Sequence, residues 1–472
     1  MACAACGATA APQVAAAELP EAASSEAAGR PTSTRPSGPR RPPFHAMAKP
    51  AGPDCNLACS YCFYREKEQL YPAGTVHRMS DEVLESYVRQ YLAAHDGDTV
   101  EFAWQGGEPT LLGLGFFQRV VALQARYANG RQVTNALQTN GVLLDSQWGD
   151  FLAANRFLVG LSIDGPPEVH DRHRIDRGGR PSFALVDRGL RVLRDAGVLF
   201  NTLTVVTRQS AEHGALVYQF LREEGSGFLQ FIPIVERRAV ASNANGLTLV
   251  GPQDHPRARV TGWSVDPSGY GRFLNEVFDR WVRTDVGRVF LQPVDIALGA
   301  WLGQPAGLCT AAETCGRAVV VEHNGDVYSC DHFVYPACRL GNLLEQPLVE
   351  LVASPAQQRF GAAKRDALPQ YCRACTYLFA CHGGCPKHRI LRTPAGEPGL
   401  NYLCAGYRAF YGHLAPYLDA MAGLLRAGRP AAEIMPCVDQ LVPSSPPDAN
   451  TGGRNAPCPC GSGRKRKRCC GR

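Results

Sequence analysis

The chain has 472 residues, more than one hydrophobic core usually fills, so we expect one large domain with smaller additions. Hydrophobic residues make up 45% and charged residues 19%, and no uncharged apolar run approaches the length of a membrane span, which indicates a soluble globular protein. The net charge is +6, from 49 Lys plus Arg against 43 Asp plus Glu, and so small an excess does not by itself indicate a nucleic-acid partner.

The 19 cysteines fall in tight groups along a large chain without a signal peptide. Disulfide frameworks are typical of small secreted proteins, whereas metal thiolates suit a reducing cytoplasm. The pattern therefore predicts metal binding and a cytoplasmic location.

Residues 1–44 are rich in Ala, Pro, Ser and Gly and have almost no aromatic or β-branched residues. Such a segment has too little to bury, so we predict a disordered extension. It contains Cys3 and Cys6, which could bind metal as a pair. Because no further ligand group is near, we interpret Cys3 and Cys6 as two free thiols that bind no metal.

From position 47 onward, short apolar strand-like runs alternate with amphipathic helical patterns, which indicates an α/β fold. In the first helix Ser80 suits the N-cap, Asp81 and Glu82 suit the first turn, and apolar residues then repeat at helical spacing. The predicted strands are 46–50, 99–104, 132–139, 157–163, 199–207 and 228–235. Six such units predict a partial (β/α)6 TIM-like barrel over residues 45–240.

Three motifs lie at the C-terminal ends of predicted strands: GGEP (106–109), TNG (139–141) and SIDG (162–165). Each alone is weak, because Gly, Pro, Asn and Asp are ordinary turn residues. Active sites of such barrels are built at the carboxyl ends of the strands, so the joint position of the motifs predicts a functional site there.

The stretch CNLACSYCF places Cys55, Cys59 and Cys62 directly after the first predicted strand. Zinc sites usually take four ligands and disulfides take pairs. Three thiolates fit a cluster of four irons and four sulfides that leaves one iron without a protein ligand. A zinc site lacking a ligand, or a buried apolar cluster, is the weaker alternative.

The remaining segments follow in order. A connecting segment, 241–308, includes a predicted helix at about 268–285, and a cysteine-dense region, 309–426, closes with an amphipathic helix at roughly 407–426. A Pro-, Ser- and Gly-rich linker is predicted over 427–454, before the compact end NAPCPCGSGRKRKRCCG.

The three cysteines, followed by Phe63 and Tyr64, resemble the motif of the radical S-adenosylmethionine (SAM) superfamily. The resemblance implies that the open iron binds the amino and carboxylate groups of SAM, and that an electron from the cluster cleaves SAM to a 5′-deoxyadenosyl radical. The residues it assigns to SAM binding are Gly106, Gly107 and Glu108 of GGEP, and Ser162 and Asp164 of SIDG. Arg174 could pair with a carboxylate of SAM or of the substrate, or lie at a solvated, charge-rich helix start.

The second cysteine region resembles the SPASM domain, which houses two auxiliary iron–sulfur clusters. It has Cys315, nine residues, Gly325, four residues and Cys330, and then CxxCx5CxxxC spacing. By resemblance the first auxiliary cluster takes Cys309, Cys315, Cys330 and Cys385, and the second takes Cys372, Cys375, Cys381 and Cys404, which makes three [4Fe-4S] clusters in all. Zinc ribbons are the alternative, although they leave the CxxxC spacing unexplained. Cys338 and Cys437 are left over and are interpreted as structural.

Over residues 46–415 the chain resembles anaerobic sulfatase-maturating enzymes, which oxidise a Cys or Ser of an unfolded sulfatase to formylglycine. The stretches that carry the resemblance are MAKPAGPDCNLACSYCFY, WQGGEPTLLG, LQTNGVLLD, GLSIDGPPEVHDRHR, QFIPIVE and GDVYSCDHFVYP. It implies an electron donor such as flavodoxin or ferredoxin.

The same resemblance makes Asp331 the general base, and we expect the neighbouring anionic cluster to raise its pKa. Tyr64 and Gln105 match positions that touch the peptide or the radical site. Taken alone, the three residues read as a turn Asp, a packing aromatic and a turn-flanking amide.

The end of the chain resembles the SEC-C zinc motif, with Cys458, Cys460, Cys469 and Cys470 as zinc ligands. The basic run 464–468 would offset the charge of the site, or could attract the phosphates of a nucleic acid. The implied partners are a ribosome, translocase or chaperone that presents unfolded chains.

Two other functions compete with sulfatase maturation. One is a SPASM-type enzyme that makes thioether or carbon–carbon links in a ribosomal peptide. The other is a non-catalytic iron–sulfur or zinc adaptor.

Overall fold

Residues 43–242, 246–251, 258–441 and 465 are described by a computed structural model of the chain. All of them belong to one compact unit, residues 41–472. Almost all of the predicted disordered extension, part of the predicted linker and the four cysteines of the predicted zinc motif lie outside the described residues.

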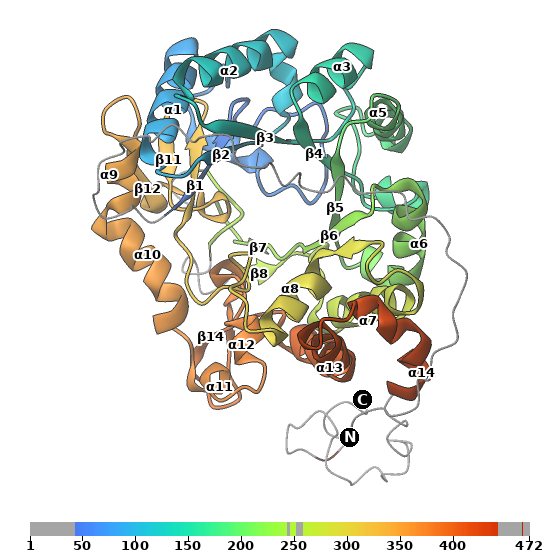
Figure 1. The fold of residues 1–472 in the computed structure, drawn as a ribbon. Helices are drawn as coiled ribbons and strands as arrows, with labels where there is room; N and C mark the ends of the chain where they lie inside the picture. Colours follow the sequence, from blue (N-terminus) through green and yellow to red (C-terminus); the bar gives the residue numbers. More distant parts are fainter. Residues whose placement is uncertain (1–42, 243–245, 252–257, 442–464, 466–472) are drawn as a thin grey trace, which may run out of the picture. The chain divides into compact units, whose positions relative to one another are not determined.

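Six parallel strands form the barrel and pair in chain order (Figure 1). They are β1 (His45–Lys49), β2 (Thr99–Trp104), β3 (Gln132–Thr139), β4 (Phe157–Ser162), β5 (Phe200–Val206) and β6 (Phe228–Pro233). Each lies within two residues of its predicted bounds. The predicted fold class is confirmed, because strands that pair in sequence with a helix between them build this kind of barrel.

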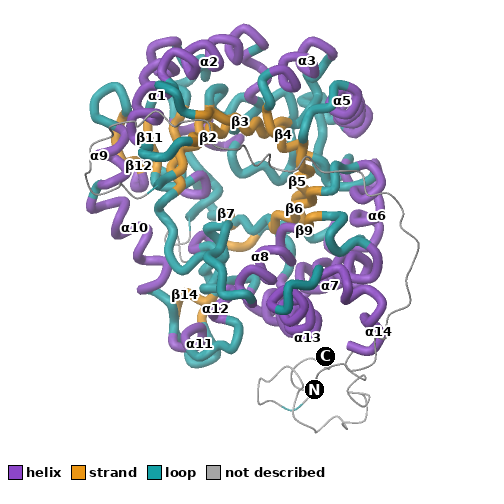
Figure 2. Tube along the Cα trace, viewed as in Figure 1, coloured by secondary structure: helices purple, strands orange, loops and turns teal. Residues whose placement is uncertain are grey.

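Five helices cover the outside of these strands in Figures 1 and 2: α1 (Asp81–Ala94), α2 (Leu114–Tyr127), α3 (Ser146–Ala154), α5 (Phe183–Asp195) and α6 (Gly214–Glu224). The predicted start of α1 is confirmed, because the Ser80 hydroxyl accepts a hydrogen bond from the Val83 amide at 3.2 Å. The inward face of α1 packs in the main apolar core, which also includes Trp104 and Phe117.

The sheet does not end at the barrel. β10 (Ala318–Glu322) pairs in parallel with β1, and β11 (Asp326–Tyr328) and β12 (Arg339–Asn342) continue the sheet as antiparallel strands. On the other side β9 (Phe290–Leu291) pairs in parallel with β6. The sequence patterns did not predict these strands, and through β10 the cysteine-dense region shares a sheet with the barrel.

Two long helices, α7 (Pro267–Thr284) and α13 (Cys404–Arg426), pack closely against each other beside the barrel. A Cβ on Gly406 would lie 2.2 Å from the Pro267 carbonyl oxygen, so only glycine allows this approach. Both helices were predicted, but α13 begins at Cys404 and thereby holds that thiol at its first turn.

The predicted linker begins with ordered structure, because η7 (Ala431–Cys437) and α14 (Val438–Leu441) fold there with Ile434 and Val438 buried. The other elements are η1 (Arg65–Leu70), η2 (Pro109–Leu112), α4 (Pro167–His170), η3 (Ser210–Glu212), β7 (Arg237–Arg238), β8 (Arg259–Val260), α8 (Gln292–Trp301), η4 (Asp331–Phe333), η5 (Pro336–Cys338), α9 (Leu348–Ala353), α10 (Pro355–Asp366), α11 (Gln370–Arg373), α12 (Leu378–Cys381), η6 (Pro386–His388), β13 (Leu391–Arg392) and β14 (Pro398–Leu400). Among the described residues no helix is both long and apolar enough to cross a membrane.

Candidate functional site

The loop after β1 holds the first three cysteines. Main-chain hydrogen bonds fix it to the segment after β4, from Ala58 N to Ile175 O (2.7 Å) and from Ser60 N to His173 O (3.0 Å). Two N–H groups point at Cys55 Sγ, the Leu57 amide at 3.4 Å and the Asn140 side-chain amide at 3.6 Å. Such donors suit a sulfur that carries negative charge.

Burial opposes ionisation of two thiols of this loop, Cys55 and Cys59. Burial raises the pKa of Cys55 to about 12, with Glu108 adding to the effect, and burial raises the pKa of Cys59 to about 11. Thiolates at these positions therefore need a positive partner, and bound iron is a partner of this kind.

The GGEP motif packs directly on this loop. Gly107 N donates to Gly52 O (2.8 Å) and Glu108 N donates to Asp54 O (2.7 Å). A Cβ on Gly107 would lie 1.8 Å from the Asp54 carbonyl oxygen, so the position requires glycine. The close approach puts the main chain of Gly106 and Gly107 beside the cysteine loop.

Glu108 is buried, and both oxygens of its carboxylate accept hydrogen bonds from other residues of the protein. One oxygen accepts hydrogen bonds from Thr110 N (3.0 Å), Thr110 Oγ1 (2.6 Å) and Thr139 Oγ1 (2.7 Å), and the other accepts one from Asn140 N (2.7 Å). A carboxylate offers about four acceptor positions. Glu108 therefore ties the GGEP loop to the TNG loop, which the sequence had not indicated.

Asp164 and Arg174 form a buried ion pair, with 3.0 Å between Arg174 Nε and Asp164 Oδ2. Tyr61 OH also donates to Asp164 (2.6 Å), and the Arg174 guanidinium lies 5.6 Å from the centre of the Tyr61 ring. Burial opposes ionisation of Asp164, but Arg174 holds its pKa below the usual value. Arg174 is 7% exposed, which rules out the solvated helix start among the two alternatives for this residue.

The two remaining residues assigned to this end of the barrel lie at strand ends. Ser162, the last residue of β4, accepts a hydrogen bond from Gln138 Nε2 (3.0 Å). Gln105 follows β2, and its main-chain N–H donates a hydrogen bond to Ala48 O (2.9 Å).

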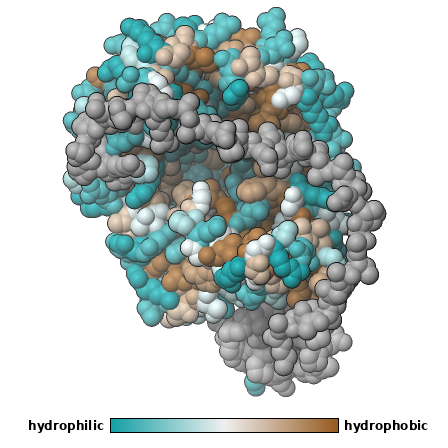
Figure 3. Space-filling model, viewed as in Figure 1, coloured by the Kyte–Doolittle hydropathy of each residue, from teal (hydrophilic) through white to brown (hydrophobic). Residues whose placement is uncertain are grey.

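Four thiols of the second region meet around one cavity of about 390 Å³: Cys309, Cys315, Cys330 and Cys385. Side chains of β1, β6 and β10 line the same cavity, so it opens onto the barrel interior. Apolar residues gather around the recessed middle of the face in Figure 3. Burial raises the pKa of Cys385 to about 11, and the neighbouring thiols Cys309 and Cys315 add to the rise.

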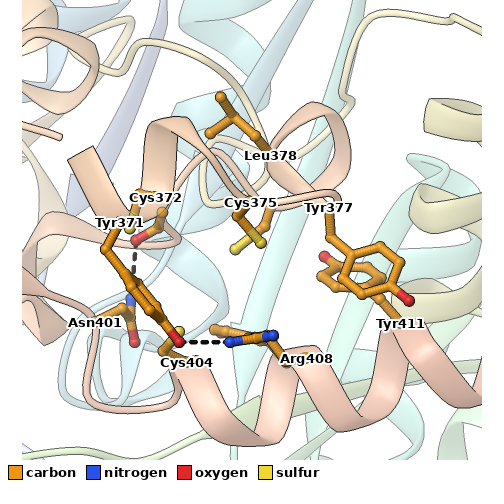
Figure 4. Close-up of a pocket in the computed structure, with 12 residues that line it drawn as sticks. Tyr371, Cys372, Cys375, Tyr377, Leu378, Asn401, Cys404, Arg408 and Tyr411 are labelled. Atoms are coloured by element: carbon orange, nitrogen blue, oxygen red, sulfur yellow. Dashed lines mark hydrogen bonds between the residues drawn. The ribbon is translucent and has the colours of Figure 1, made fainter. Parts of the chain in front are cut away.

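The other four thiols, Cys372, Cys375, Cys381 and Cys404, line a separate cavity of about 30 Å³. Cys372 comes from α11 and Cys404 from the start of α13, with Tyr371 and Arg408 beside them (Figure 4). Burial raises the pKa of Cys404 to about 12, with contributions from the other three thiols. Arg408 donates a hydrogen bond to Tyr371 OH at the edge of this group.

Asp331 lies in the larger cavity, beside Cys330, and its carboxylate pairs with the ammonium of Lys49. The protein's own groups shift the pKa of Asp331 downward, opposite to the rise expected from a neighbouring cluster. Burial by itself would raise this pKa. The positive charge of Lys49, aided by His332 and Lys387, outweighs burial and holds the pKa of Asp331 below its usual value.

Tyr64 is buried, and its hydroxyl donates a hydrogen bond to Glu322. Lys49 Nζ lies 3.6 Å from the centre of its ring, so one ammonium contacts both Tyr64 and Asp331. A second buried ion pair, Lys387 with Glu236, lies close by, with the Lys387 ammonium 4.0 Å from the centre of the Phe63 ring.

Lys49, Glu322, Lys387 and Glu236 are functional candidates that the sequence analysis missed. The available signal was the charged residue itself: Lys49 follows the apolar run AMA at the end of its strand, and Glu322 ends the run AVVVE. A charge at such a position is rarely buried without a partner.

Among the described residues no three His, Cys, Asp or Glu side chains lie close enough together to hold a single metal ion. Cys338 and Cys437 belong to neither thiol group and lie in η5 and η7. Cys3, Cys6 and the four cysteines after position 455 lie outside the described residues.

Family models match three parts of the chain. The radical SAM superfamily matches residues 50–221, the SPASM iron-sulfur cluster-binding domain matches residues 309–376, and the SEC-C motif matches residues 454–472. These matches bear out the three resemblances drawn from the motifs.

Curated relatives match over most of their length. A serine-type anaerobic sulfatase-maturating enzyme of Bacteroides thetaiotaomicron is 45% identical, over 83% of this chain and 94% of the relative. A cysteine-type anaerobic sulfatase-maturating enzyme of Clostridium perfringens is 34% identical, over 82% of this chain and all of the relative. The solved structure of native anSMEcpe with bound AdoMet and Cp18Cys peptide has a TM-score of 0.71 at 34% identity, and the match covers 81% of this chain and 99% of that one.

Proposed function

Because the chain belongs to the family of anaerobic sulfatase-maturating enzymes, we propose that it oxidises a Cys or Ser side chain of an unfolded sulfatase polypeptide to formylglycine. The observation that carries the proposal is the shared cavity, in which Asp331 and one group of four thiols face the barrel interior. A side chain that enters this cavity would meet the Asp331 carboxylate and the four thiols that would hold a redox cluster.

In this proposal the cysteines hold three iron–sulfur clusters. Cys55, Cys59 and Cys62 would hold the barrel cluster and leave one iron open, and each group of four thiols would ligate an auxiliary cluster fully. When bound, SAM and these clusters supply the radical that removes a hydrogen from the substrate and the path that takes up the remaining electron.

The chain's own groups orient the reactants and move the proton. The main chain at Gly106 and Gly107, with Ser162 and the Asp164–Arg174 pair, would form the SAM site beside the cysteine loop. Asp331 would take the proton of the substrate thiol or hydroxyl, since its ion pair keeps the carboxylate ionised and able to accept. Tyr64 and Gln105 would border the reacting side chain.

The remaining assignments concern the ends of the chain and its partners. We propose a barrel over 45–240, a SPASM region over 309–426, and a zinc site formed by Cys458, Cys460, Cys469 and Cys470 in the SEC-C motif. The zinc tail would bring the enzyme to a ribosome, translocase or chaperone, and a flavodoxin or ferredoxin would supply electrons. Unchanged sulfatase maturation in cells after deletion of residues 455–472 would contradict the docking role.

The direct test is an anaerobic assay of the protein reconstituted with iron and sulfide, with SAM, a reductant and a peptide containing Cys-x-Pro-x-Arg or its Ser counterpart. We expect 5′-deoxyadenosine together with a peptide mass loss of about 18 units for Cys or about 2 for Ser, and Asp331→Asn should lose the peptide product by about 100-fold or more. If 5′-deoxyadenosine forms while both peptides stay unchanged, the substrate class is wrong.

A further inference from the structure

The pairing of β1 with β10 places two buried, oppositely charged residues side by side. Lys49 is the last residue of β1 and Glu322 the last of β10, and they are direct register partners in the parallel pair. Side chains of register partners point to the same face of a sheet. Lys49 is 1% exposed and Glu322 is fully buried, so both charges must find partners inside the protein.

Their partners are the two residues proposed to act on the substrate side chain. Lys49 forms its ion pair with Asp331, and Glu322 accepts the hydrogen bond of the Tyr64 hydroxyl. Lys49 also lies over the Tyr64 ring, at 3.6 Å from its centre, within the range of a cation–π contact. The four side chains therefore form one connected group, which we name the β1–β10 clamp.

The contacts of the clamp cross between the two halves of the chain. Lys49 and Tyr64 come from the barrel and the cysteine loop, whereas Glu322 and Asp331 come from the strand β10 and the turn after β11. Lys49 of the barrel thus holds Asp331 of the cysteine-dense region, and Glu322 of that region holds Tyr64 of the cysteine loop. A shift of β10 against β1 by one residue would turn Glu322 to the opposite face and break its contact with Tyr64.

We propose that Lys49 and Glu322 are positioning residues: Lys49 fixes the Asp331 carboxylate at the cavity, and Glu322 fixes the Tyr64 side chain, whose ring contacts the Lys49 ammonium. This inference rests on the proposed function, since it concerns the same reaction. Neither residue lines the cavity itself, so both act through the side chains that they hold.

The first test separates positioning from cofactor chemistry. Lys49→Met keeps an unbranched side chain that is shorter by one heavy atom and removes the charge, and Lys49→Arg keeps the charge. We expect Lys49→Met to form 5′-deoxyadenosine at a rate within about twofold of the unchanged protein, but to yield at least tenfold less formylglycine per 5′-deoxyadenosine. Lys49→Arg should restore most of this ratio, because the guanidinium can still pair with Asp331.

The matched control is Lys67→Met. Lys67 is equally buried and lies over another ring, 3.5 Å from the centre of Tyr335, without an ion pair to Asp331. Its removal should leave the ratio of product to 5′-deoxyadenosine unchanged. The proposal would be overturned if Lys49→Met left the ratio of formylglycine to 5′-deoxyadenosine unchanged. It would also be overturned if the ratio fell equally in Lys49→Met and Lys67→Met.

The second test does not depend on the reaction. ¹⁹F NMR of the reconstituted holoenzyme, labelled with 3-fluorotyrosine, reports the surroundings of Tyr64, whose resonance is assigned by its loss in Tyr64→Phe. We expect Glu322→Ala to shift or broaden this resonance and Glu322→Gln, which keeps an acceptor oxygen, to change it less. If Glu322→Ala leaves the resonance sharp and unshifted, Glu322 does not position Tyr64.

The two tests also separate this inference from the proposed function. If the unchanged protein converts neither the Cys nor the Ser peptide, the proposed function fails, and the NMR comparison of Lys49→Met and Glu322→Ala then decides whether the clamp orders Tyr64. If the peptide is converted but neither variant alters the ratio or the resonance, the proposed function stands and the positioning role is wrong.

Discussion

Replacement of Glu108 by Gln gives a quantitative test of how the GGEP and TNG loops are held together at the end of the barrel. The Glu108 carboxylate accepts three hydrogen bonds at one oxygen and one, from the Asn140 amide at 2.7 Å, at the other. In Glu108→Gln the side chain has a single acceptor oxygen. With that oxygen toward the two threonines, the new NH₂ group faces the Asn140 N–H, and two donors oppose each other.

The expected magnitude follows from the lost bond. A hydrogen bond to a charged acceptor contributes about 1.5 to 3 kcal/mol, which corresponds to roughly 10- to 150-fold in the equilibrium for local opening. Burial raises the pKa of Glu108 in spite of its hydrogen bonds, so removal of the charge also relieves a cost of desolvation. The overall melting temperature therefore responds weakly, and a local measurement is the sharper one.

The assay is amide hydrogen exchange of the whole protein, read from peptides that cover residues 139–142. We expect exchange at Asn140 to accelerate by roughly 10- to 150-fold in Glu108→Gln. The matched control is Glu101→Gln, an exposed glutamate on β2, the strand that precedes the GGEP loop, and it should leave these peptides unchanged. Unaltered exchange at Asn140 in Glu108→Gln would show that Glu108 does not tie the two loops together.

Three further predictions concern other parts of the molecule. Arg174→Met leaves the carboxylate of Asp164 buried without its cation, and chemical denaturation should show a loss of about 3 to 5 kcal/mol in the free energy of unfolding; a loss below about 1 kcal/mol would contradict this. Burial lowers the pKa of His170 to about 3, below its unfolded value near 6.5, so its contribution to stability is complete above pH 6.5 and is lost as pH falls toward 3. His170→Gln should therefore make the melting temperature fall less steeply between pH 6.5 and 4. If the melting temperature of the variant falls as steeply as that of the unchanged protein, buried neutral His170 is not the cause of the fall. Elemental analysis should find about one zinc per chain, lost in Cys458→Ser but kept in Cys338→Ser.

The order of strands and helices could be predicted because it depends on short-range patterns. Alternating apolar runs, a serine N-cap and turn residues act within a few positions of the chain, and these signals placed β1 to β6, α1 and α7. The cysteine spacings are equally local, so they indicate cluster chemistry without reference to any long-range contact. For the same reason β9, β10 and the folded start of the predicted linker were missed, since only contacts with distant segments stabilise them.

The sequence by itself determined the chemistry of the site: three cysteines in CxxxCxxC, a second set of eight, and an aspartate next to one of them. Only the tertiary structure decided the environment of those groups. Asp331 has a lowered pKa because Lys49 reaches it across the β1–β10 pair, and Arg174 is buried because Asp164 pairs with it. Charge–charge energies depend on distance and burial, which spacing along the chain does not encode, so the partners of buried charges become visible only in the fold.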